Sequence, residues 1–542
     1  MTGMSEMALA LLRRWPSLLL AAILWLAGTV LLARVFTRRT FFDRYVTAAT
    51  PEHLAAIRIL TCAILLGSTL WENLASSALL PAGLRQPMGV MRVFYALPLG
   101  VDRLVGDAGA LAASGWFTAL ILLFGMAGLA TRITIPLGAL CYLLFGGILR
   151  QYSWFYHQGI MPLYLLVVLS FTPCGDGLSV DRLLKIALRR PVPPAGTATA
   201  GYGWARYACW IAIALPYVES GLSKLRHGGL SWWDAHNLRP VFYAAALEPE
   251  KLNWSLGLRL THVPDALIEC LGIAALLIEL AYGAVLFSRL ARRVLPYAAS
   301  CLHVGILFLQ SILFYDMLLL QLVFLEWSTV RDTIGRVLPA LRARIPQDVA
   351  PRPHSARKAG EGARFPLGVS AMAIASMLVW TFGIEFYPLT GWPMYSYRQL
   401  TTTIAYTRLY ARDETGAVFR AYVSDAIPAL AGTRALPALG MCAVAQDSDD
   451  IRLCRRLFSA AALAYNRAAP PGRRVVQFRL QKWSWDLRAF PTDPHCATMI
   501  RDTTFALAPN DPTWVTHHVI PPSLEPGAPA CGKPRAATSA RP

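Results

Sequence analysis

The chain has 542 residues, of which 55% are hydrophobic and 15% are charged, and its mean hydropathy is +0.43. Soluble globular proteins carry about 25% charged residues. This composition therefore excludes a disordered protein, a small disulfide-rich protein and an ordinary soluble enzyme, and it favours a polytopic membrane protein. The net charge of +19 is also typical of nucleic-acid-binding proteins, but many basic residues lie in short loops between apolar runs, where they set topology. We therefore expect a lipid bilayer and no nucleic acid as partner.

Apolar runs organise most of the chain. A helix needs about 20 apolar residues to cross a bilayer. Ten runs approach this length, near residues 17–36, 54–77, 110–130, 133–149, 157–173, 204–222, 265–288, 294–312, 314–327 and 366–388. We interpret the first run as a membrane anchor, and whether it crosses the bilayer stays open. The runs 133–149 and 314–327 are short for a span, so the sequence predicts nine or ten transmembrane helices.

The loops between these runs differ in charge. The loops form two alternating sets. The first consists of residues 34–53, 131–132, 174–203, 289–293 and 328–365, and the second consists of residues 1–16, 78–109, 150–156, 223–264 and 313. The first set carries 20 Lys and Arg residues, whereas the second set carries 11. Because cytoplasmic loops are richer in basic residues, the first set is predicted to be cytoplasmic. The tail that follows the last run is then extracytoplasmic.

The tail has a different pattern. Residues 401–412, 417–424 and 474–484 alternate like strands, residues 449–468 are typical of an amphipathic helix, and the Pro-, Ala- and Gly-rich end is predicted to be disordered. The predicted fold is thus an all-α polytopic membrane bundle followed by a small α+β extracytoplasmic domain. Its predicted parts are an anchor segment (1–50), a transmembrane core (51–330), a basic cytoplasmic loop (331–365), the last transmembrane helix (366–395) and the tail domain (396–542).

The tail also contains an even number of cysteines. We interpret these as disulfide candidates, because an extracytoplasmic compartment is oxidising. They are Cys442, Cys454, Cys496 and Cys531. Four cysteines allow three pairings, and the sequence does not choose among them. No CxxC, HExxH, phosphate-loop, GxSxG or Rossmann motif is present, so we predict no metal site and no hydrolase or ATPase activity of those types.

Ionisable residues at membrane depth are the main functional signal in a membrane protein. The segment Tyr217–Trp233 combines Glu219, Ser220, Gly221 and Lys224 near a helix end. Gly221 permits close packing or a bend, and Lys224 follows Ser220 by one turn on the same face. A lysine in an apolar environment loses its proton more readily and can act as a base. The alternative is that Lys224 reaches the lipid headgroups or neutralises Glu219.

Two histidines lie in comparable positions. His157 opens a helix at the same membrane face as Lys224, where a neutral imidazole can donate a hydrogen bond to a developing oxyanion. An equally good alternative is a bond to a neighbouring backbone carbonyl. His303 lies in the middle of a predicted helix, where a histidine more often bonds another helix than catalyses a reaction.

These segments, taken together and in this order, resemble the vitamin K-dependent γ-carboxylase superfamily. The resemblance is closer to its bacterial members, which have a horizontally transferred transmembrane (HTTM) domain. The similar stretches are His53-Leu-Ala-Ala-Ile-Arg58, Tyr156-His157 leading to Pro173-Cys-Gly-Asp and Ser179-Val-Asp181, Trp204-Ala-Arg-Tyr, Ser220-Gly-Leu-Ser-Lys224-Leu with Trp232 downstream, Cys301-Leu-His303-Val-Gly-Ile, and Tyr387-Pro-Leu-Thr-Gly-Trp-Pro-Met-Tyr. The stretches up to His303 belong to residues 53–327, which is half of the chain.

The resemblance implies a chemistry. Such enzymes use a reduced quinone and oxygen to generate a strong base, which removes a proton from a glutamate side chain before carbon dioxide adds. The lysine of the family's Gly-x-x-Lys-Leu motif, the proposed base, corresponds to Lys224, and His157 would bond the reacting glutamate or its oxyanion. The implied cofactor is reduced vitamin K or menaquinone. The supporting pocket residues would be Glu219, Ser220, Gly221, Trp232, His303 and Arg58.

Two functions follow from these expectations. In the first, the chain is a γ-carboxylase-like enzyme that couples quinone epoxidation to carboxylation of a glutamyl or other acceptor. In the second, it is a non-enzymatic anchor or scaffold that presents the tail to a periplasmic protein or peptide, because the tail is a separate domain and the family's propeptide-binding region has no counterpart. Ser223 also stands where the animal enzyme of the family has a second lysine. A transporter is weaker, since no inverted repeat is visible. The rich Ala, Arg and Pro usage favours a bacterial cytoplasmic (inner) membrane.

Overall fold

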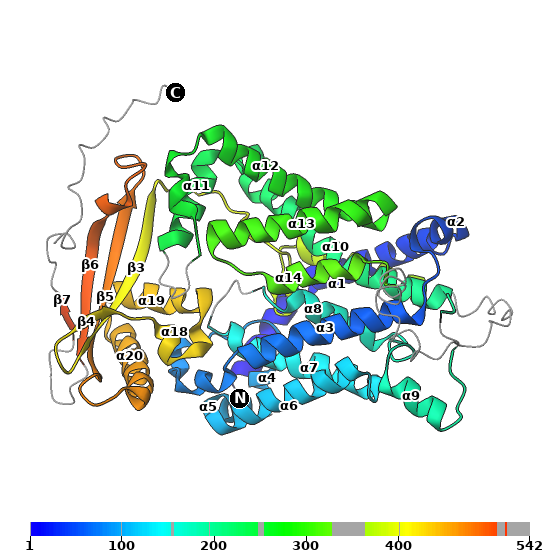
Figure 1. Cartoon of the computed structure of the whole chain (residues 1–542), viewed down its shortest axis with the longest axis horizontal. Coiled ribbons are helices and arrows are strands. Elements are labelled where there is room, and N and C mark those ends of the chain that lie inside the picture. The colour runs from blue at the N-terminus through cyan, green and yellow to red at the C-terminus, as the bar shows by residue number, and fades with distance from the viewer. Residues whose placement is uncertain are drawn as a thin grey trace, which may run out of the picture.

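The computed structural model describes residues 2–98, 100–152, 157–193, 196–247, 254–327, 364–399, 401–506 and 515–517. Most of them are helical, and a small sheet follows the helices near the C-terminus (Figure 1). The helices run roughly parallel to the long axis of the molecule. This arrangement places both ends of a bundle on opposite sides of an apolar middle, as a membrane protein requires.

Six helical segments within the described residues are long and apolar enough to cross a bilayer, and they confirm a multi-pass membrane protein as the fold class. They are Leu19–Phe36 of α1 (Thr2–Phe36), α3 (Pro51–Trp71), α6 (Ala108–Ala127), α7 (Thr131–Arg150), α12 (Asp265–Ala281) with its continuation η6 (Tyr282–Leu286), and α13 (Arg289–Gln310). The run predicted at 133–149 is therefore long enough, because its helix begins at Thr131 and ends at Arg150.

The other four predicted runs form helices that are shorter or more polar. Three are short apolar helices: α8 (Ile160–Ser170), α14 (Tyr315–Leu320) with η7 (Gln321–Phe324), and α17 (Arg364–Thr381). The fourth, α10 (Ala200–Gly228), has 29 residues, about 43 Å of helix, but it contains several charged side chains. Nine or ten spans therefore stay a prediction.

Short elements connect these helices. At one end of the bundle, away from the sheet, lie α2 (Arg39–Phe41), the π-helical turn η1 (Phe42–Val46) and α9 (Val180–Ala187) (Figure 1). The remaining connections are η2 (Leu74–Leu79), η3 (Ala82–Leu84), α4 (Val90–Ala96), α5 (Val101–Gly106), η4 (Gly229–Ser231), α11 (Ala235–Leu247) and η5 (Gly257–His262). Residues 223–264 were expected to be a loop without a helix. The structure corrects this expectation, because α11 lies within the segment.

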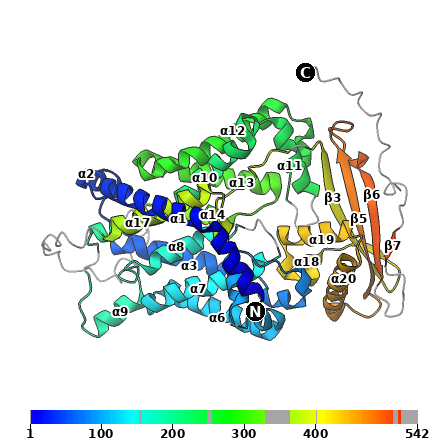
Figure 2. The same ribbon diagram turned by 180° about the vertical axis from the view of Figure 1, so that it is seen from behind.

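The first and last membrane helices lie side by side at the back of the molecule (Figure 2). Trp25 Nε1 on α1 donates to Ala371 O on α17 at 2.9 Å. A Cβ atom on Gly28 would lie 3.0 Å from Ile374 Cγ2, so glycine permits this close approach. The amino-terminal run thus packs as part of the bundle.

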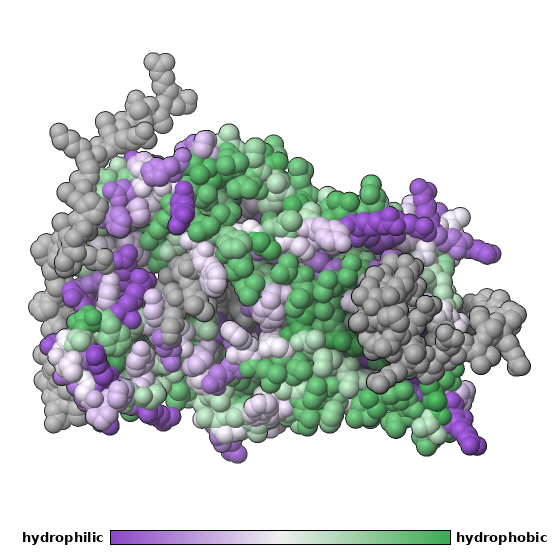
Figure 3. Space-filling view, viewed as in Figure 1, coloured by the Kyte–Doolittle hydropathy of each residue, from purple (hydrophilic) through white to green (hydrophobic). Residues whose placement is uncertain are grey.

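The surface has the distribution that a bilayer selects. Figure 3 shows apolar side chains over the middle of the helices and polar side chains toward the two ends. Large exposed apolar residues on α6, α12 and α13 include Trp116, Phe117, Leu267, Leu277, Leu290 and Val294. Because an apolar surface of this extent is unfavourable in water, the lipid bilayer is the environment of this part of the chain.

The tail forms an antiparallel sheet of five strands in the order β4-β3-β5-β6-β7. Its strands are β3 (Thr403–Asp413), β4 (Val418–Arg420), β5 (Val475–Asp486), β6 (Thr498–Ala506) and β7 (Val515–His517). The three predicted strands correspond to β3, β4 and β5, whereas β6 and β7 were not predicted. A separate two-stranded ribbon, β1 (Glu385–Phe386) with β2 (Leu389–Thr390), precedes the sheet.

Helices cover one face of this sheet. They are α18 (Val423–Ala426), α19 (Ala435–Val444) and α20 (Ser448–Ala468), accompanied by the turns η8 (Pro428–Leu430), η9 (Gly432–Arg434) and η10 (Pro494–Cys496). The Phe458 ring of α20 lies 5.4 Å from Phe478 and 4.5 Å from Phe505, centroid to centroid. The predicted helix 449–468 is confirmed, since Asp447 caps it by accepting from Asp449 N and Asp450 N.

Two of the four disulfide-candidate cysteines are paired. Cys442 of α19 and Cys454 of α20 are bonded, with 5.5 Å between their Cα atoms. Cys496 is buried, with Sγ 3.3 Å from Asp493 Oδ2. Cys531 lies outside the described residues, so a second pair stays a prediction.

The tail is docked on the bundle through polar and aromatic contacts. Arg434 donates two bonds to the carboxylate of Glu72, which ends α3, at 2.9 and 2.6 Å. Ala429 N donates to Ser76 Oγ at 2.8 Å. On the other side of the sheet, Trp485 stacks on Tyr243 of α11 with 5.3 Å between centroids.

Asp181 joins two connections at the opposite end of the bundle. Its carboxylate accepts from Ala130 N, Thr131 N and Thr131 Oγ1 at 2.6–2.8 Å, and thereby caps α7. Burial alone would raise the pKa of Asp181, but the bonds from Thr131 and Ala130 hold it below its usual value.

Asp181→Asn is therefore expected to lower the free energy of unfolding by about 1 kcal/mol at neutral pH. A carboxylate with a lowered pKa stabilises the fold above its unfolded-state pKa, and this contribution disappears as the pH falls through its folded-state pKa. The difference between wild type and variant should shrink accordingly below about pH 4 in thermal melts across pH. Asp43→Asn, which removes an exposed pair with Arg39, is the control and should change stability by under about 0.5 kcal/mol. A penalty for Asp181→Asn that does not vary with pH would contradict this role.

Candidate functional site

The centre of the site is the C-terminal part of α10. Thr199 caps the start of this helix by accepting from Tyr202 N at 3.4 Å, and the helix ends where Gly229 takes a positive φ of 63°. Residues four apart lie on one helix face, so Ser220 and Lys224 point the same way, as the sequence predicts. Gly221 lies against α12, where an added Cβ would be 2.9 Å from Leu280 Cδ2. Close packing at Gly221 is thus confirmed.

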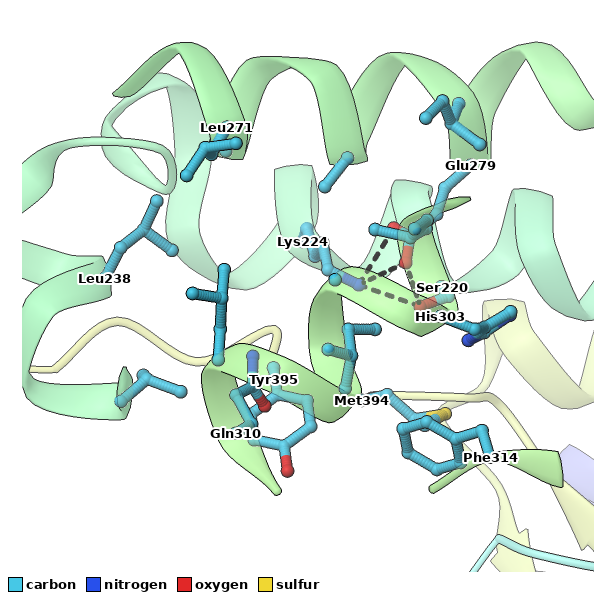
Figure 4. Close-up of a pocket in the computed structure, with 18 of the residues that line it drawn as sticks. Ser220, Lys224, Leu238, Leu271, Glu279, His303, Gln310, Phe314, Met394 and Tyr395 are labelled. Atoms are coloured by element: carbon cyan, nitrogen blue, oxygen red, sulfur yellow. Dashed lines mark hydrogen bonds and ion pairs between the residues drawn. The ribbon is translucent and has the colours of Figure 1, made fainter. Parts of the chain in front are cut away.

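Lys224 is buried in a network of polar contacts. Only 5% of the residue is exposed. Its Nζ lies 2.9 and 2.8 Å from Glu279 Oε1 and Oε2 and donates to Ser220 Oγ at 2.9 Å (Figure 4). The ammonium also lies 5.3 Å from the centroid of the Trp232 ring. A buried ionisable group that pairs with a carboxylate from a second helix of an apolar bundle is a strong functional signal.

A cavity adjoins this network. Its volume is about 340 Å³, enough for the head group and part of the chain of a lipid-soluble molecule. Its wall is mostly apolar and comes from α10, α11, α12, α13, the start of α14 and the segment 392–399, including Val241, Phe242, Leu271, Ala274, Ile278, Leu302, Ile306, Leu309, Phe314 and Met394. Leu271, Ala274 and Cys301 line the cavity and are exposed. The cavity is therefore reached from the apolar side of the bundle that α12 and α13 form.

A second group of hydrogen-bonded polar side chains ends at the cavity wall. His303 of α13 lines the cavity, and its Nε2 lies 2.5 Å from Tyr217 Oη. Gln321 Nε2 lies 2.9 Å from the same oxygen, and the Tyr282 hydroxyl donates to Gln321 Oε1. The sequence assigned Tyr217 and Gln321 no role, because their partners come from helices far away in the chain.

His157 lies next to the cavity but not in its wall. It precedes α8, and its ring stacks on Trp392 with 5.3 Å between centroids. Trp392 itself lines the cavity. His157 Nε2 lies 3.3 Å from Thr390 Oγ1, and that hydroxyl donates to Glu385 Oε2 at 2.8 Å. The indole of Trp392 therefore lies between His157 and the cavity.

The remaining predicted residues divide into two groups. Ser220, Trp232 and His303 line the cavity together with Lys224, whereas Glu219, Gly221 and Arg58 are not among the lining residues. Arg58 donates to Cys174 O and Leu178 O, both at 2.6 Å, and so holds the loop after α8. Arg58 therefore does not line this cavity.

The expected alternative partner of Lys224 is wrong. Glu219 accepts from Ser376 Oγ of α17 at 2.7 Å, and Lys224 pairs with Glu279 instead. Residues five apart on a helix point about 140° away from each other, so Glu219 and Lys224 face different neighbours. Glu279 is an intramembrane carboxylate in the sequence, but only the packing of α12 on α10 reveals its partner.

The chemistry of the wall fits an apolar ring that carries oxygen atoms. Apolar side chains surround the space, while Lys224, His303 and Gln310 contribute polar atoms at separate places. Among the described residues, no three His, Cys, Asp or Glu side chains gather as metal ligands. Comparisons of the chain with protein-family models, with curated proteins and with solved structures find no match.

Proposed function

We propose that this chain is a membrane enzyme that binds a reduced quinone in the cavity beside Lys224 and uses it, with oxygen, to drive a γ-carboxylase-like reaction. In balanced form, reduced quinone, oxygen, carbon dioxide and an acceptor C–H group become quinone epoxide, water and a carboxylated acceptor. The acceptor is a glutamyl side chain or a related acid on a periplasmic protein or peptide. The observation that carries the proposal is the buried Lys224–Glu279 pair at the wall of an apolar cavity.

In this proposal, Lys224 removes the proton from a hydroxyl group of the bound hydroquinone. A lysine can accept a proton only when its amine is neutral. The ammonium group of Lys224 must therefore lose a proton first. Glu279 lies within hydrogen-bond distance of Nζ and is the acceptor for it, while Ser220 holds Nζ in place. The apolar wall excludes water, which protects a strong base from being quenched.

The proposed setting follows from the resemblance to HTTM proteins and from the loop charges. The chain spans a bacterial cytoplasmic membrane nine or ten times, with the sheet-bearing tail outside the cytoplasm. The cavity lies near the end of α10 that leads into α11, and the segment 392–399, which leads into the tail, also lines it. An extracytoplasmic acceptor would therefore approach from this side. His157, beside Trp392, would act on that acceptor rather than on the quinone.

Oxygen-dependent epoxide formation tests the proposal. Purified protein in lipid nanodiscs is supplied with reduced menaquinone, oxygen, bicarbonate and a glutamyl peptide. The wild type is expected to form epoxide, and Lys224→Ala to lose at least about a hundredfold in rate, the contribution of a positioned base. Arg259→Ala, an exposed change in η5, which packs on α11, is the control and should retain the rate. A folded Lys224→Ala protein with wild-type turnover would remove the lysine from the mechanism.

The scaffold alternative makes a different prediction for the same assay. If the helices serve only to present the tail, neither the wild type nor any variant forms epoxide, and the wild type does not bind the quinone. The observation that supports this alternative is the docked tail, which Arg434 and Glu72 fix to the bundle. Quinone binding together with epoxide formation would exclude it.

A further inference from the structure

His303 lines the cavity, and its ring nitrogen Nδ1 is a buried atom without a hydrogen-bond partner among the described residues. The residue is 6% exposed. Its Nε2 bonds Tyr217, whereas no described residue bonds its Nδ1. A buried polar group without a hydrogen bond costs about 1–3 kcal/mol. Whether Nδ1 offers a proton or a lone pair to the cavity decides what this position can bind.

The amide of Gln321 fixes the direction of the hydrogen bonds behind His303. Met317 O can only accept, so the amide atom 2.8 Å from it must be the NH₂ nitrogen, Nε2. The same nitrogen has a second hydrogen, which it donates to Tyr217 Oη at 2.9 Å. The amide oxygen accepts from the Tyr282 hydroxyl. Both ends of this buried amide are therefore satisfied in one orientation only.

The hydrogen-bond direction that Gln321 fixes also determines the direction of the bond between Tyr217 and the imidazole of His303. Because the Tyr217 oxygen accepts from Gln321, its single hydrogen is available for the 2.5 Å contact with His303 Nε2. Nε2 then accepts, and in a neutral imidazole the hydrogen lies on the other nitrogen. Nδ1 is therefore a hydrogen-bond donor. A backbone carbonyl, an amide and two phenols fix this tautomer.

Two other residues that line the cavity also carry a buried polar atom without a partner among the described residues. These atoms are Trp392 Nε1, a donor, and Gln310 Oε1, an acceptor. Both residues are at least nine-tenths buried. A hydrocarbon chain would leave all three atoms unsatisfied, whereas a ring with oxygen substituents can bond them. The wall thus selects for a lipid-soluble molecule that bears oxygen.

We propose that His303 donates a hydrogen bond from Nδ1 to a carbonyl or phenolic oxygen of the cavity ligand, and that Tyr217, Gln321 and Tyr282 hold its ring in the tautomer that can do so. The inference rests on the proposed function, since it takes the ligand to be the quinone. It adds a binding residue on α13, and three positioning residues behind it. The ligand oxygen that accepts from His303 is held without any transfer of a proton from the protein.

The test compares two probes that differ only in oxygen. One is menaquinone with a short prenyl chain, and the other is the same prenylated methylnaphthalene without the two ring oxygens. Both are titrated into full-length protein in nanodiscs. His303→Phe is expected to weaken menaquinone binding about tenfold, the effect of one hydrogen bond, and to leave the oxygen-free probe within about twofold. Ile306→Val, on the same wall of α13, is the control and should affect both probes alike.

The tautomer is tested separately by the ¹⁵N chemical shifts of the two ring nitrogens of His303. The wild type should show the hydrogen on Nδ1, and Tyr217→Phe should show both tautomers. A hydrogen on Nε2 in the wild type would overturn the inference even if His303→Phe does not fold. An equal loss of both probes, or no loss of either, would also overturn it and leave the proposed function standing. A wild type that binds neither probe would overturn both proposals.

Discussion

Glu279→Leu is expected to lower the free energy of unfolding by about 3–5 kcal/mol, because it leaves the Lys224 ammonium buried without its carboxylate. The pair is largely buried, since the two side chains are 6% and 13% exposed. Moving charges out of water costs free energy. The attraction between the two charges, which is strong at the low dielectric constant of the interior, offsets this cost only while both partners are present. The loss should be measured by thermal or detergent denaturation in a defined lipid.

The double variant Lys224→Met/Glu279→Leu separates stability from function. Replacing a buried ion pair by apolar residues of similar volume is often neutral or stabilising, so the double variant should recover most of the lost stability. It should nevertheless form no quinone epoxide, since the proposed base is gone. Glu269→Gln is the matched control, because it is on the same helix and its only described bond is a 3.5 Å contact from Ala235 N. A double variant as unstable as Glu279→Leu would contradict the view that the unpaired charge causes the loss.

Arg434→Met is expected to release the tail from the bundle. The Arg434 and Glu72 side chains are 2% and 10% exposed, and the guanidinium bonds both carboxylate oxygens. The substitution buries the Glu72 carboxylate without its cation, at a cost of about 3–5 kcal/mol that undocking can relieve. Hydrogen exchange should therefore increase at η2, η8 and η9, where the tail meets the bundle, and much less in β3 and β5 at the centre of the sheet.

Two further variants sharpen this prediction. Arg434→Met/Glu72→Leu removes both charges and should restore slow exchange at the contact. Arg452→Gln removes an exposed pair with Asp449 on α20 and should cost no more than about 1 kcal/mol. If Arg434→Met exchanges like the wild type, the aromatic contact between Trp485 and Tyr243 is sufficient for docking, and the ion pair is not needed.

Patterns that repeat within one element could be predicted from the sequence. The apolar runs became helices, because runs of this length satisfy their backbone hydrogen bonds only as helices in lipid. The alternation in 401–412 and 474–484 became β3 and β5. β6 was not predicted, because its polar residues Arg501, Asp502 and Thr503 interrupt the alternation. In the folded sheet, Arg479 of the neighbouring strand β5 neutralises Asp502.

Contacts between elements could not be predicted in this way. Ser220 and Lys224 share a face by helical periodicity alone, but Glu279 reaches them from a helix 55 residues later. The partner of Glu72 is 362 residues away. Likewise, the sequence signals that His303 is costly at membrane depth, whereas its tautomer depends on Tyr217 and Gln321, which only packing brings together.

The most direct measurement is a cryo-electron microscopy structure of the full chain reconstituted with menaquinone in lipid nanodiscs. The account predicts density for the ring in the cavity, with one oxygen within hydrogen-bond distance of Lys224 or its Ser220–Glu279 partners and another near His303 Nδ1. The prenyl chain should leave between α12 and α13, past Cys301. A cavity that holds only a lipid acyl chain, with menaquinone bound elsewhere or not at all, would contradict the claim that this is a quinone site.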